Sequence, residues 1–346
     1  MEPGAGKDAS GSQEKVIRGG VIGYGAAFNM GRSHLKWMAA AGLQPTAVCD
    51  ADPGRLQDAA KDFRGIETYT GVAEMLRKSP VDLVTVITPH HTHAALAVQC
   101  LEAGRHVIVE KPMCITVAEA DRMIAAAQKS GVMLSVFHNR RWDGDFKALR
   151  DIIGRGLIGD IFHIEAFSGG YADPGTWWRA DKRISGGIIY DWGAHFVDWI
   201  LNLVPAEMES IMGYFHQDLV WKDATNEDQA QAIIRFANGA VADLQCSQVA
   251  FCGKMKWRIL GAKGCICDGR REGHFLVTTE VQGLRAEIEV KHQSTNWDAY
   301  YQNIAGHLLR GEELAVTAEQ ARRVIQVLEG AEKASKAGKT IKPKYG

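Results

Sequence analysis

Long apolar runs and a surplus of either charge are both missing from this 346-residue sequence. No run approaches the ~20 consecutive apolar residues that a membrane helix needs. Forty basic and 41 acidic side chains nearly balance, which argues against a general electrostatic affinity for nucleic acid or for a membrane surface. The first 15 residues are rich in Gly and Ser and lack the apolar core of a secretory signal, so we expect 1–15 to be a disordered tail.

Paired cysteines are missing as well, because the seven cysteines are scattered and include no CxxC motif. This pattern argues against a disulfide framework and favours a reducing compartment, for which we expect the cytoplasm. Cys265 and Cys267 stand one residue apart and could bind a metal together with a histidine. Two cysteines on the same face of a strand explain this spacing better.

Two patterns of secondary structure divide the chain. From Val16, short apolar runs alternate with amphipathic segments, which predicts a doubly wound parallel sheet with right-handed crossovers. After Arg140 the runs read as strands joined by hairpins, with Asn238-Gly239 as one clear turn. We therefore expect an α/β dinucleotide-binding domain over 16–138 and an α+β domain with an open, mostly antiparallel sheet over 139–346.

The predicted helices of the second domain suffice to cover one face of its sheet. No further segment remains for the other face, which must also be shielded from water. We therefore expect a second copy of the chain to cover it, in a homodimer or homotetramer.

A glycine-rich turn, GYGAAFNMG, joins the first predicted strand to the first predicted helix. Glycines at this place let the backbone approach a pyrophosphate at a helix N-terminus. Gly31 follows Gly25 by six positions instead of three, which a longer turn would explain. We expect a dinucleotide to bind along this turn, at Gly23, Gly25, Ala26, Phe28, Asn29 and Met30.

Asp50 ends the second predicted strand, where an acidic side chain can accept hydrogen bonds from ribose hydroxyls. The same carboxylate would repel a 2′-phosphate, so NAD is favoured over NADP. Arg55 lies close enough to contact the cofactor and weakens this preference.

Residues 186–204 form a predicted helix with two opposing stripes at helical spacing. The stripe expected to face the core consists of Trp192, Phe196, Trp199, Ile200 and Leu203. The second stripe is wholly polar and consists of Asp191, His195, Asp198 and Asn202. The polar stripe is either the solvated side of the helix or a surface that faces a substrate.

Three segments resemble the Gfo/Idh/MocA family of two-domain oxidoreductases, which includes glucose–fructose oxidoreductase and inositol dehydrogenases. They are VIGYG, then ITPHHTHAALAVQCLEAGRHVIVEKP, and finally GGIIYDWGAHFVD. The second is similar to the family's Thr-Pro…His…Gly-x-His-Val…Glu-Lys-Pro block, and the third to its Gly-Gly…Asp-x-Gly-x-His-x-x-Asp block. The resemblance covers the chain from Val16 and implies a Rossmann first domain; the long glycine turn departs from the pattern.

The Glu-Lys-Pro block follows a predicted parallel strand, at the edge where open α/β sheets bind ligands. The resemblance implies that Lys111 contacts both the substrate hydroxyl and the nicotinamide ribose, placing positive charge beside a developing alkoxide. Glu110 would position this segment and contact the cofactor. Pro112 would follow a cis peptide bond, as it does in relatives.

Asp191 and His195 lie one helical turn apart and project on the same side. We expect His195 to be the general base, because an unperturbed imidazole titrates near neutral pH. Asp191 would hold substrate hydroxyls. Asp198 and Asn202 lie further along the helix, and we expect them to be structural.

Other candidate residues follow predicted strands or lie in an aromatic loop. His90, His91 and His93 lie close together in one loop and could form a metal site, but hydride transfer needs no metal. We expect Pro89 and His93 to line the cofactor and no metal to be bound. Further substrate contacts are expected from His138 and Arg141, and from the loop residues Tyr171, Trp177, Trp178, Arg179 and Lys182, unless that loop is simply a surface segment over two tryptophans.

The favoured function is an NAD-dependent dehydrogenase that acts on a secondary hydroxyl of a sugar, inositol or sugar derivative. An alternative from the same family is a glycoside-cleaving enzyme that oxidises C3 transiently and regenerates its NAD. Net formation of NADH discriminates the two. A cofactor-binding sensor without chemistry is disfavoured, because Lys111, Asp191 and His195 are all present.

Overall fold

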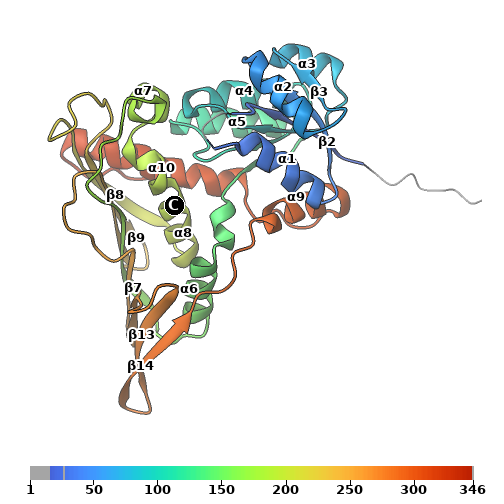
Figure 1. The fold of residues 1–346 in the computed structure, drawn as a ribbon. Coiled ribbons are helices and arrows are strands. Elements are labelled where there is room, and N and C mark those ends of the chain that lie inside the picture. Colours follow the sequence, from blue (N-terminus) through green and yellow to red (C-terminus); the bar gives the residue numbers. More distant parts are fainter. Residues whose placement is uncertain (1–15, 26–27, 345–346) are drawn as a thin grey trace, which may run out of the picture.

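The computed structural model describes residues 16–25 and 28–344, which form two sheets with their helices (Figure 1). The expected tail at 1–15 and Ala26 of the glycine turn lie outside the described residues. Within these residues, no helix is both long enough and apolar enough to span a bilayer.

The first half is a six-stranded parallel sheet in the order β3-β2-β1-β4-β5-β6, as in dinucleotide-binding folds. Its strands are β1 (Arg18–Ile22), β2 (Gln44–Cys49), β3 (Glu67–Tyr69), β4 (Leu83–Val86), β5 (His106–Val109) and β6 (Leu134–Val136). Its helices are α1 (Met30–Ala40), α2 (Pro53–Asp62), α3 (Val72–Lys78), α4 (His93–Glu102) and α5 (Val117–Ser130). The predicted alternation of strands and helices is confirmed.

Local sequence explains where these elements begin and end. All four residues of β4 are buried, as expected for a strand covered on both faces. Asp52 caps α2 by accepting the backbone N–H of Gly54 at 2.8 Å. Thr116 and Glu119 form a reciprocal capping box at the start of α5.

The second half is an eight-stranded sheet in the order β14-β13-β12-β11-β7-β10-β9-β8. Its strands are β7 (Ile161–Gly169), β8 (Met208–His216), β9 (Gln229–Phe236), β10 (Val241–Ser247), β11 (Trp257–Gly261), β12 (Gly264–Asp268), β13 (His274–Val281) and β14 (Leu284–Lys291). Only the β7–β10 pair is parallel among the described strand pairs of this sheet. The predicted open, mostly antiparallel sheet is therefore confirmed, and the β9–β10 hairpin turns at Asn238-Gly239 as expected.

The helices of this half are α6 (Gly144–Gly154), α7 (Lys182–Ser185), α8 (Trp192–Leu203), α9 (Asp298–Arg310) and α10 (Ala318–Ala337). Figure 1 shows α6, α8 and α10 on the side of the second sheet that faces the first half. The sequence analysis missed α9, although Tyr300, Ile304 and Leu308 recur at helical spacing and are buried.

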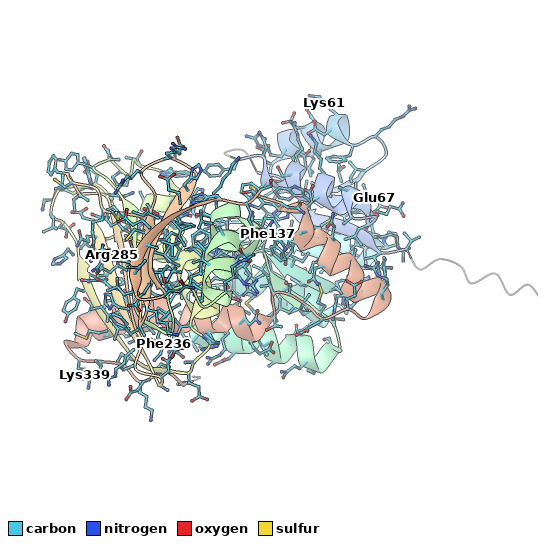
Figure 2. The ribbon with its side chains drawn as sticks, turned by 90° about the horizontal axis from the view of Figure 1, so that it is seen from below. Lys61, Glu67, Phe137, Phe236, Arg285 and Lys339 are labelled. Atoms are coloured by element: carbon cyan, nitrogen blue, oxygen red, sulfur yellow. The ribbon has the colours of Figure 1, made fainter. Side chains whose placement is uncertain are left out.

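After β14 the chain returns to the first half, where α9 lies beside α1 (Figure 1). The Tyr300 hydroxyl lies 2.8 Å from Ser135 Oγ, and the Tyr301 hydroxyl lies 3.0 Å from Thr85 Oγ1. Phe137, at the end of β6, is buried at the junction of the two halves (Figure 2). These contacts hold α9 against α1 and against the strands β4 and β6 of the first sheet.

Candidate active site

The glycine turn is closed against the first sheet by close backbone contacts. Gly23 has φ +90°, and a Cβ there would lie 2.8 Å from the carbonyl oxygen of Ile87. A Cβ on Gly31 would lie 2.7 Å from the backbone of Tyr24. Gly31 thus permits the close packing of α1 on the turn that the third fingerprint glycine provides.

Asp50 is oriented by the glycine turn. Its carboxylate accepts the backbone N–H groups of Tyr24 at 2.7 Å, Gly25 at 3.4 Å and Asp52 at 2.9 Å. Arg55 lies 3.7 Å from Asp52 and 3.8 Å from Asp58. The charge of Arg55 is therefore directed to the carboxylates of Asp52, just before α2, and of Asp58, within α2.

A cleft of about 700 Å³ runs between the glycine turn and the start of α8. The residues predicted for cofactor, substrate or catalysis that line it are Gly25, Phe28, Met30, Pro89, His93, Glu110, Lys111, Trp177, Trp178, Arg179, Asp191 and His195. Gly23, Asn29, Asp50 and Arg55 belong to the same edge but do not line this cleft. The structure thus brings the three predicted catalytic side chains to one wall.

Glu110 stabilises the Lys111-Pro112 turn by hydrogen bonding. The peptide bond between Lys111 and Pro112 is cis, as expected. One carboxylate oxygen of Glu110 accepts the backbone N–H of Lys111 at 2.9 Å, and the other lies 3.1 Å from His34 Nε2. Burial acts to raise the pKa of Glu110, but hydrogen bonding to His34 and the charge of Lys111 lower it overall. His34 Nδ1 in turn lies 2.7 Å from the Tyr301 hydroxyl.

Lys111, Asp191 and Arg179 form a charged cluster at the mouth of the cleft. Lys111 Nζ donates to Asp191 Oδ1 at 2.7 Å, and Arg179 donates to Asp191 Oδ2 at 2.8 Å. Burial acts to raise the pKa of Asp191, but the two cations outweigh it and lower the pKa to about 2. Asp191 is therefore a carboxylate throughout the physiological pH range.

His195 lies on the cleft wall and is only 5% exposed. Its ring makes no hydrogen bond within the described residues and packs against Trp192 and Trp199. Burial first, and then the charges of Lys111 and Arg140, lower the pKa of His195 well below 6.5. The imidazole is thus neutral at pH 7, a proton acceptor that is weaker than an unperturbed histidine.

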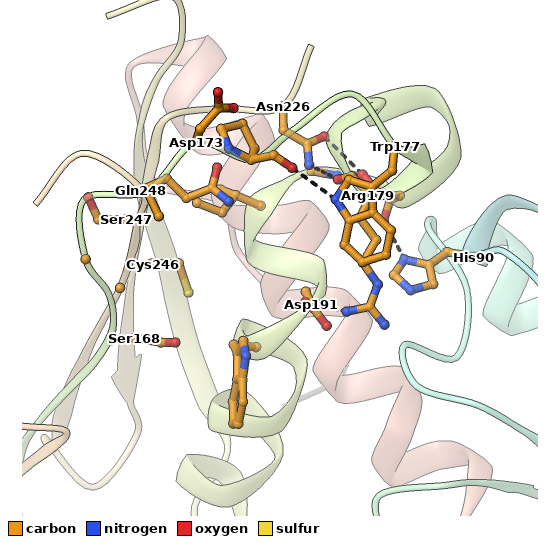
Figure 3. A pocket seen from close by; sticks show the side chains of 18 residues that line it. His90, Ser168, Asp173, Trp177, Arg179, Asp191, Asn226, Cys246, Ser247 and Gln248 are labelled. Atoms are coloured by element: carbon orange, nitrogen blue, oxygen red, sulfur yellow. Dashed lines mark hydrogen bonds and ion pairs between the residues drawn. The ribbon is translucent and has the colours of Figure 1, made fainter. Parts of the chain in front are cut away.

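A second pocket of about 440 Å³, the distal pocket, adjoins the cleft beyond Asp191 (Figure 3). It shares five lining residues with the cleft, namely His90, Trp177, Arg179, Asp191 and Trp192. Its other walls come from the ends of β7 and β10, from the loop after β7, from the segment 185–188 at the end of α7, and from Asn226. Neither Lys111 nor His195 lines the distal pocket.

His138 and Arg141 do not reach either cavity, contrary to the substrate contacts expected for them. Arg141 is buried and donates to both carboxylate oxygens of Asp198, at 2.8 and 2.6 Å. It also donates to the carbonyl oxygen of Ala315 at 2.6 Å. His138 is fully buried behind His195, and burial lowers its pKa to about 4. These side chains support the wall rather than form it, and Asp198 is structural as predicted.

In the aromatic loop after β7, only some of the residues expected to contact substrate line a cavity. Tyr171 is 44% exposed and stacks on Phe251 at 3.9 Å outside both cavities. Lys182 is paired with Glu227 and Glu332 instead of facing either cavity. Trp177 and Arg179 do line both cavities.

Trp192 was expected in the core stripe of α8, but it is 40% exposed and lines both cavities, because α8 begins at this residue and its first turn faces the cleft. Further lining residues that the sequence analysis did not assign to the site are Ser33, Trp37, Ile87, Thr88, His90, Phe137, Asn139 and Trp297. The position of Trp192 inside the Asp-x-Gly-x-His block could have predicted that it lines the cleft. Trp297 comes from a distant segment that contains no motif, so the sequence did not indicate its place in the cleft.

His93 lies between two carbonyl oxygens, 2.7 Å from that of Thr88 and 2.9 Å from that of Pro112. It ties the end of β4 to the Lys111-Pro112 turn. His90 Nδ1 donates to the carbonyl oxygen of Ser185 at 2.7 Å, which ties this edge to α7. Across residues 16–25 and 28–344 no group of three or more His, Cys, Asp or Glu side chains has a metal-binding arrangement.

Two family models match the chain. The oxidoreductase family with an NAD-binding Rossmann fold, GFO_IDH_MocA, matches residues 17–138, and the GFO/IDH/MocA C-terminal domain matches residues 146–267.

Individual proteins match over nearly the full length. A scyllo-inositol 2-dehydrogenase (NADP(+)) of Bacillus subtilis is 28% identical, over 94% of this chain and 96% of its own. A myo-inositol 2-dehydrogenase of Thermotoga maritima is 29% identical, over 94% of this chain and 98% of its own. The crystal structure of an NAD-binding protein from Listeria innocua superposes with a TM-score of 0.84 at 25% identity, covering 95% of this chain and 97% of that one.

Proposed function

The chain belongs to the GFO/IDH/MocA family of oxidoreductases, and we propose that it transfers a hydride between a secondary hydroxyl of a sugar, inositol or related polyol and NAD. The observation that carries the proposal is the joint placement of Lys111, Asp191 and His195 on one wall of the cleft. The two inositol dehydrogenases among the relatives support a polyol as substrate.

The residues at the carboxyl edge of the first sheet fit a dinucleotide. Gly25 lines the cleft and a Cβ there would meet no atom within 4 Å, so the turn presents open backbone to a ligand. Asp50, held by the same turn, would accept the ribose hydroxyls. Pro89, His93, Glu110 and Lys111 would lie along the nicotinamide half. When bound, NAD supplies the acceptor for the hydride.

We infer NAD rather than NADP from Asp50, since its carboxylate would repel a 2′-phosphate and Arg55 is paired with other carboxylates. The Bacillus subtilis relative is named for NADP⁺, so the preference has to be measured for this chain. The ratio of Kd values for the two cofactors tests it directly.

Protein groups would handle the proton and the charge. The Lys111 ammonium, fixed by Asp191 at 2.7 Å, would donate to the reacting oxygen and stabilise its developing negative charge. The neutral His195 ring would accept the hydroxyl proton. Because Lys111 and Arg140 disfavour the charged imidazole, His195 would pass this proton on readily. Asp191, ionised at all relevant pH, would orient Lys111 and accept bonds from neighbouring hydroxyls.

The test is an assay of NADH formation with free sugars, inositols and aryl glycosides, with aglycone release followed in the same wells. NADH without aglycone supports the dehydrogenase. Aglycone without net NADH would replace it by the glycoside-cleaving reaction. Cofactor binding with neither product would favour a sensor.

We also propose that a second copy covers the open face of the eight-stranded sheet. Tyr214 is exposed on that face, and Met212 and Leu260 are partly exposed on the same side of their strands. Light scattering of the purified protein tests this, and a monomer at micromolar concentration would contradict it. The cytoplasm stays our proposed location.

A further inference from the structure

The distal pocket is set apart from the reacting groups. Hydride transfer requires the reacting carbon to lie beside Lys111 and His195, and both line the cleft but not the distal pocket. A ligand group in the distal pocket must therefore be a part of the substrate that does not react. Because the two cavities share Asp191 and Trp192, one molecule can occupy both.

The charges of the distal pocket argue against an anionic ligand. Its charged lining residues are Asp173, Asp191 and Arg179, with an excess of one negative charge. Arg179 donates to Asp191 at 2.8 Å and lies over the rings of Trp177 and Trp178, at 5.3 and 5.1 Å. A phosphate or carboxylate would lie beside the carboxylates of Asp173 and Asp191, and Arg179 alone among the charged lining residues would attract it. The net negative charge of the lining therefore disfavours sugar phosphates and uronates.

The free polar groups of the distal pocket suit hydroxyls. In the part of the chain that the structure describes, neither Ser168 Oγ nor the side-chain amide of Gln248 has a hydrogen-bond partner, and both line the pocket. Asp173 uses one carboxylate oxygen to accept Gly175 N–H at 2.8 Å, which leaves the other oxygen as an acceptor. Figure 3 shows Ser168 and Gln248 on the wall opposite Arg179. Donors and acceptors spaced around aromatic walls match an uncharged ring with several hydroxyls.

We propose that the distal pocket binds a second, uncharged, hydroxyl-bearing unit, so that the substrate is a glycoside or oligosaccharide of at least two units. This inference rests on the proposed hydride transfer, which places the reacting unit in the cleft. It specifies the substrate class: a neutral two-unit saccharide is preferred to the corresponding free monosaccharide and to a charged analogue.

The test compares kcat/KM for NADH formation with a neutral disaccharide, its single reacting unit, and the same disaccharide carrying a terminal uronate. We expect the neutral disaccharide to exceed both by about tenfold, the effect of one or two well-formed hydrogen bonds. In Ser168→Ala/Gln248→Ala the ratio of two-unit to one-unit kcat/KM should fall by about the same factor. Gln128→Ala, on the exposed side of α5, is the control and should leave the ratio unchanged.

The double variant should keep its fold, because Gln248 is held by its backbone. Its N–H donates to the Asp228 carbonyl oxygen at 2.9 Å, and its own carbonyl oxygen accepts Trp221 Nε1–H at 3.1 Å. Equal kcat/KM for one and two units, or an unchanged ratio in the double variant, would overturn the proposal.

Failure of the proposed function can be told apart from failure of this inference. If no saccharide yields NADH, binding of the neutral disaccharide is measured by quenching of tryptophan fluorescence, since Trp177 and Trp192 line the pocket. Quenching that the double variant weakens about tenfold supports the distal site although hydride transfer has failed. Absence of quenching in the unchanged protein overturns the inference.

Discussion

Replacing Lys111 by methionine should abolish most of the turnover while leaving the fold and the other cofactor-binding residues in place. Lys111 Nζ lies 2.7 Å from Asp191 Oδ1 and its side chain is 13% exposed, so the charge is placed and largely desolvated. Methionine keeps the apolar stem but has no charge to offer to an alkoxide. Removal of one such oxyanion-stabilising donor costs about 2.7–4 kcal/mol, on the order of 10²–10³ in kcat.

The assay combines steady-state NADH formation with a titration of NAD against protein fluorescence. NAD affinity should change little, because Glu110 holds the turn through the backbone N–H of Lys111 at 2.9 Å and not through its side chain. Lys78→Met is the matched control, since Lys78 also pairs with a carboxylate, Glu74 at 2.6 Å, on the distant helix α3. A Lys111→Met protein that binds NAD and turns over at the unchanged rate would refute the role of Lys111.

Three further predictions concern protons and cofactor choice. His195→Ala should lower kcat by ~10²-fold. In the unchanged protein, kcat/KM should begin to fall on the acid side only below pH 6.5, because burial and nearby cations lower the pKa of His195. A fall that begins at or above pH 6.5 would exclude His195 as the base. Asp50→Ala should weaken NAD binding more than NADP binding, and equal losses in two Kd titrations would show that Asp50 does not contact the ribose. The free energy of unfolding should fall by about 3 kcal/mol from His138 alone as pH drops from 6.5 to 4, since the folded protein holds this pKa at about 4 and so binds fewer protons than the unfolded chain. In His138→Leu, the fall in the free energy of unfolding between pH 6.5 and 4, measured by urea denaturation, should be smaller by that amount. An unchanged pH dependence of stability would contradict the lowered pKa of His138.

Local patterns were sufficient for most of the fold. Alternation of buried strands such as β4 with amphipathic helices predicted the parallel sheet of the first half, and Asn238-Gly239 marked the β9–β10 hairpin of the second sheet. The helix α9 was missed because Tyr300, Ile304 and Leu308 were not recognised as a helical stripe. The burial of Tyr300 and Tyr301 depends on contacts with Ser135 and Thr85, which are more than 160 residues away in sequence.

The site was predictable where chemistry and motif coincide, and less so where packing decides. Glu110, Lys111, Asp191 and His195 do meet on one cleft. The near-neutral pKa expected for His195 is not what the structure gives, since burial beside Lys111 lowers it well below 6.5. A sequence does not reveal how deeply a side chain is desolvated.

Roles assigned by position alone were the least secure. Arg141 follows the last strand of the first sheet, where a substrate contact was expected, but its guanidinium is occupied by Asp198 and by the Ala315 carbonyl. His34 carried no motif, yet it lies 3.1 Å from Glu110. Both cases depend on residues distant in sequence, so local reading could not assign them.

The most direct test of the central claim is to follow the hydrogen that leaves the sugar carbon. With a substrate deuterated at the reacting carbon, mass spectrometry of the nicotinamide after a single turnover should show NADH heavier by one deuterium. Product formation with unlabelled NADH, or with no change in the cofactor at all, would contradict hydride transfer at this site.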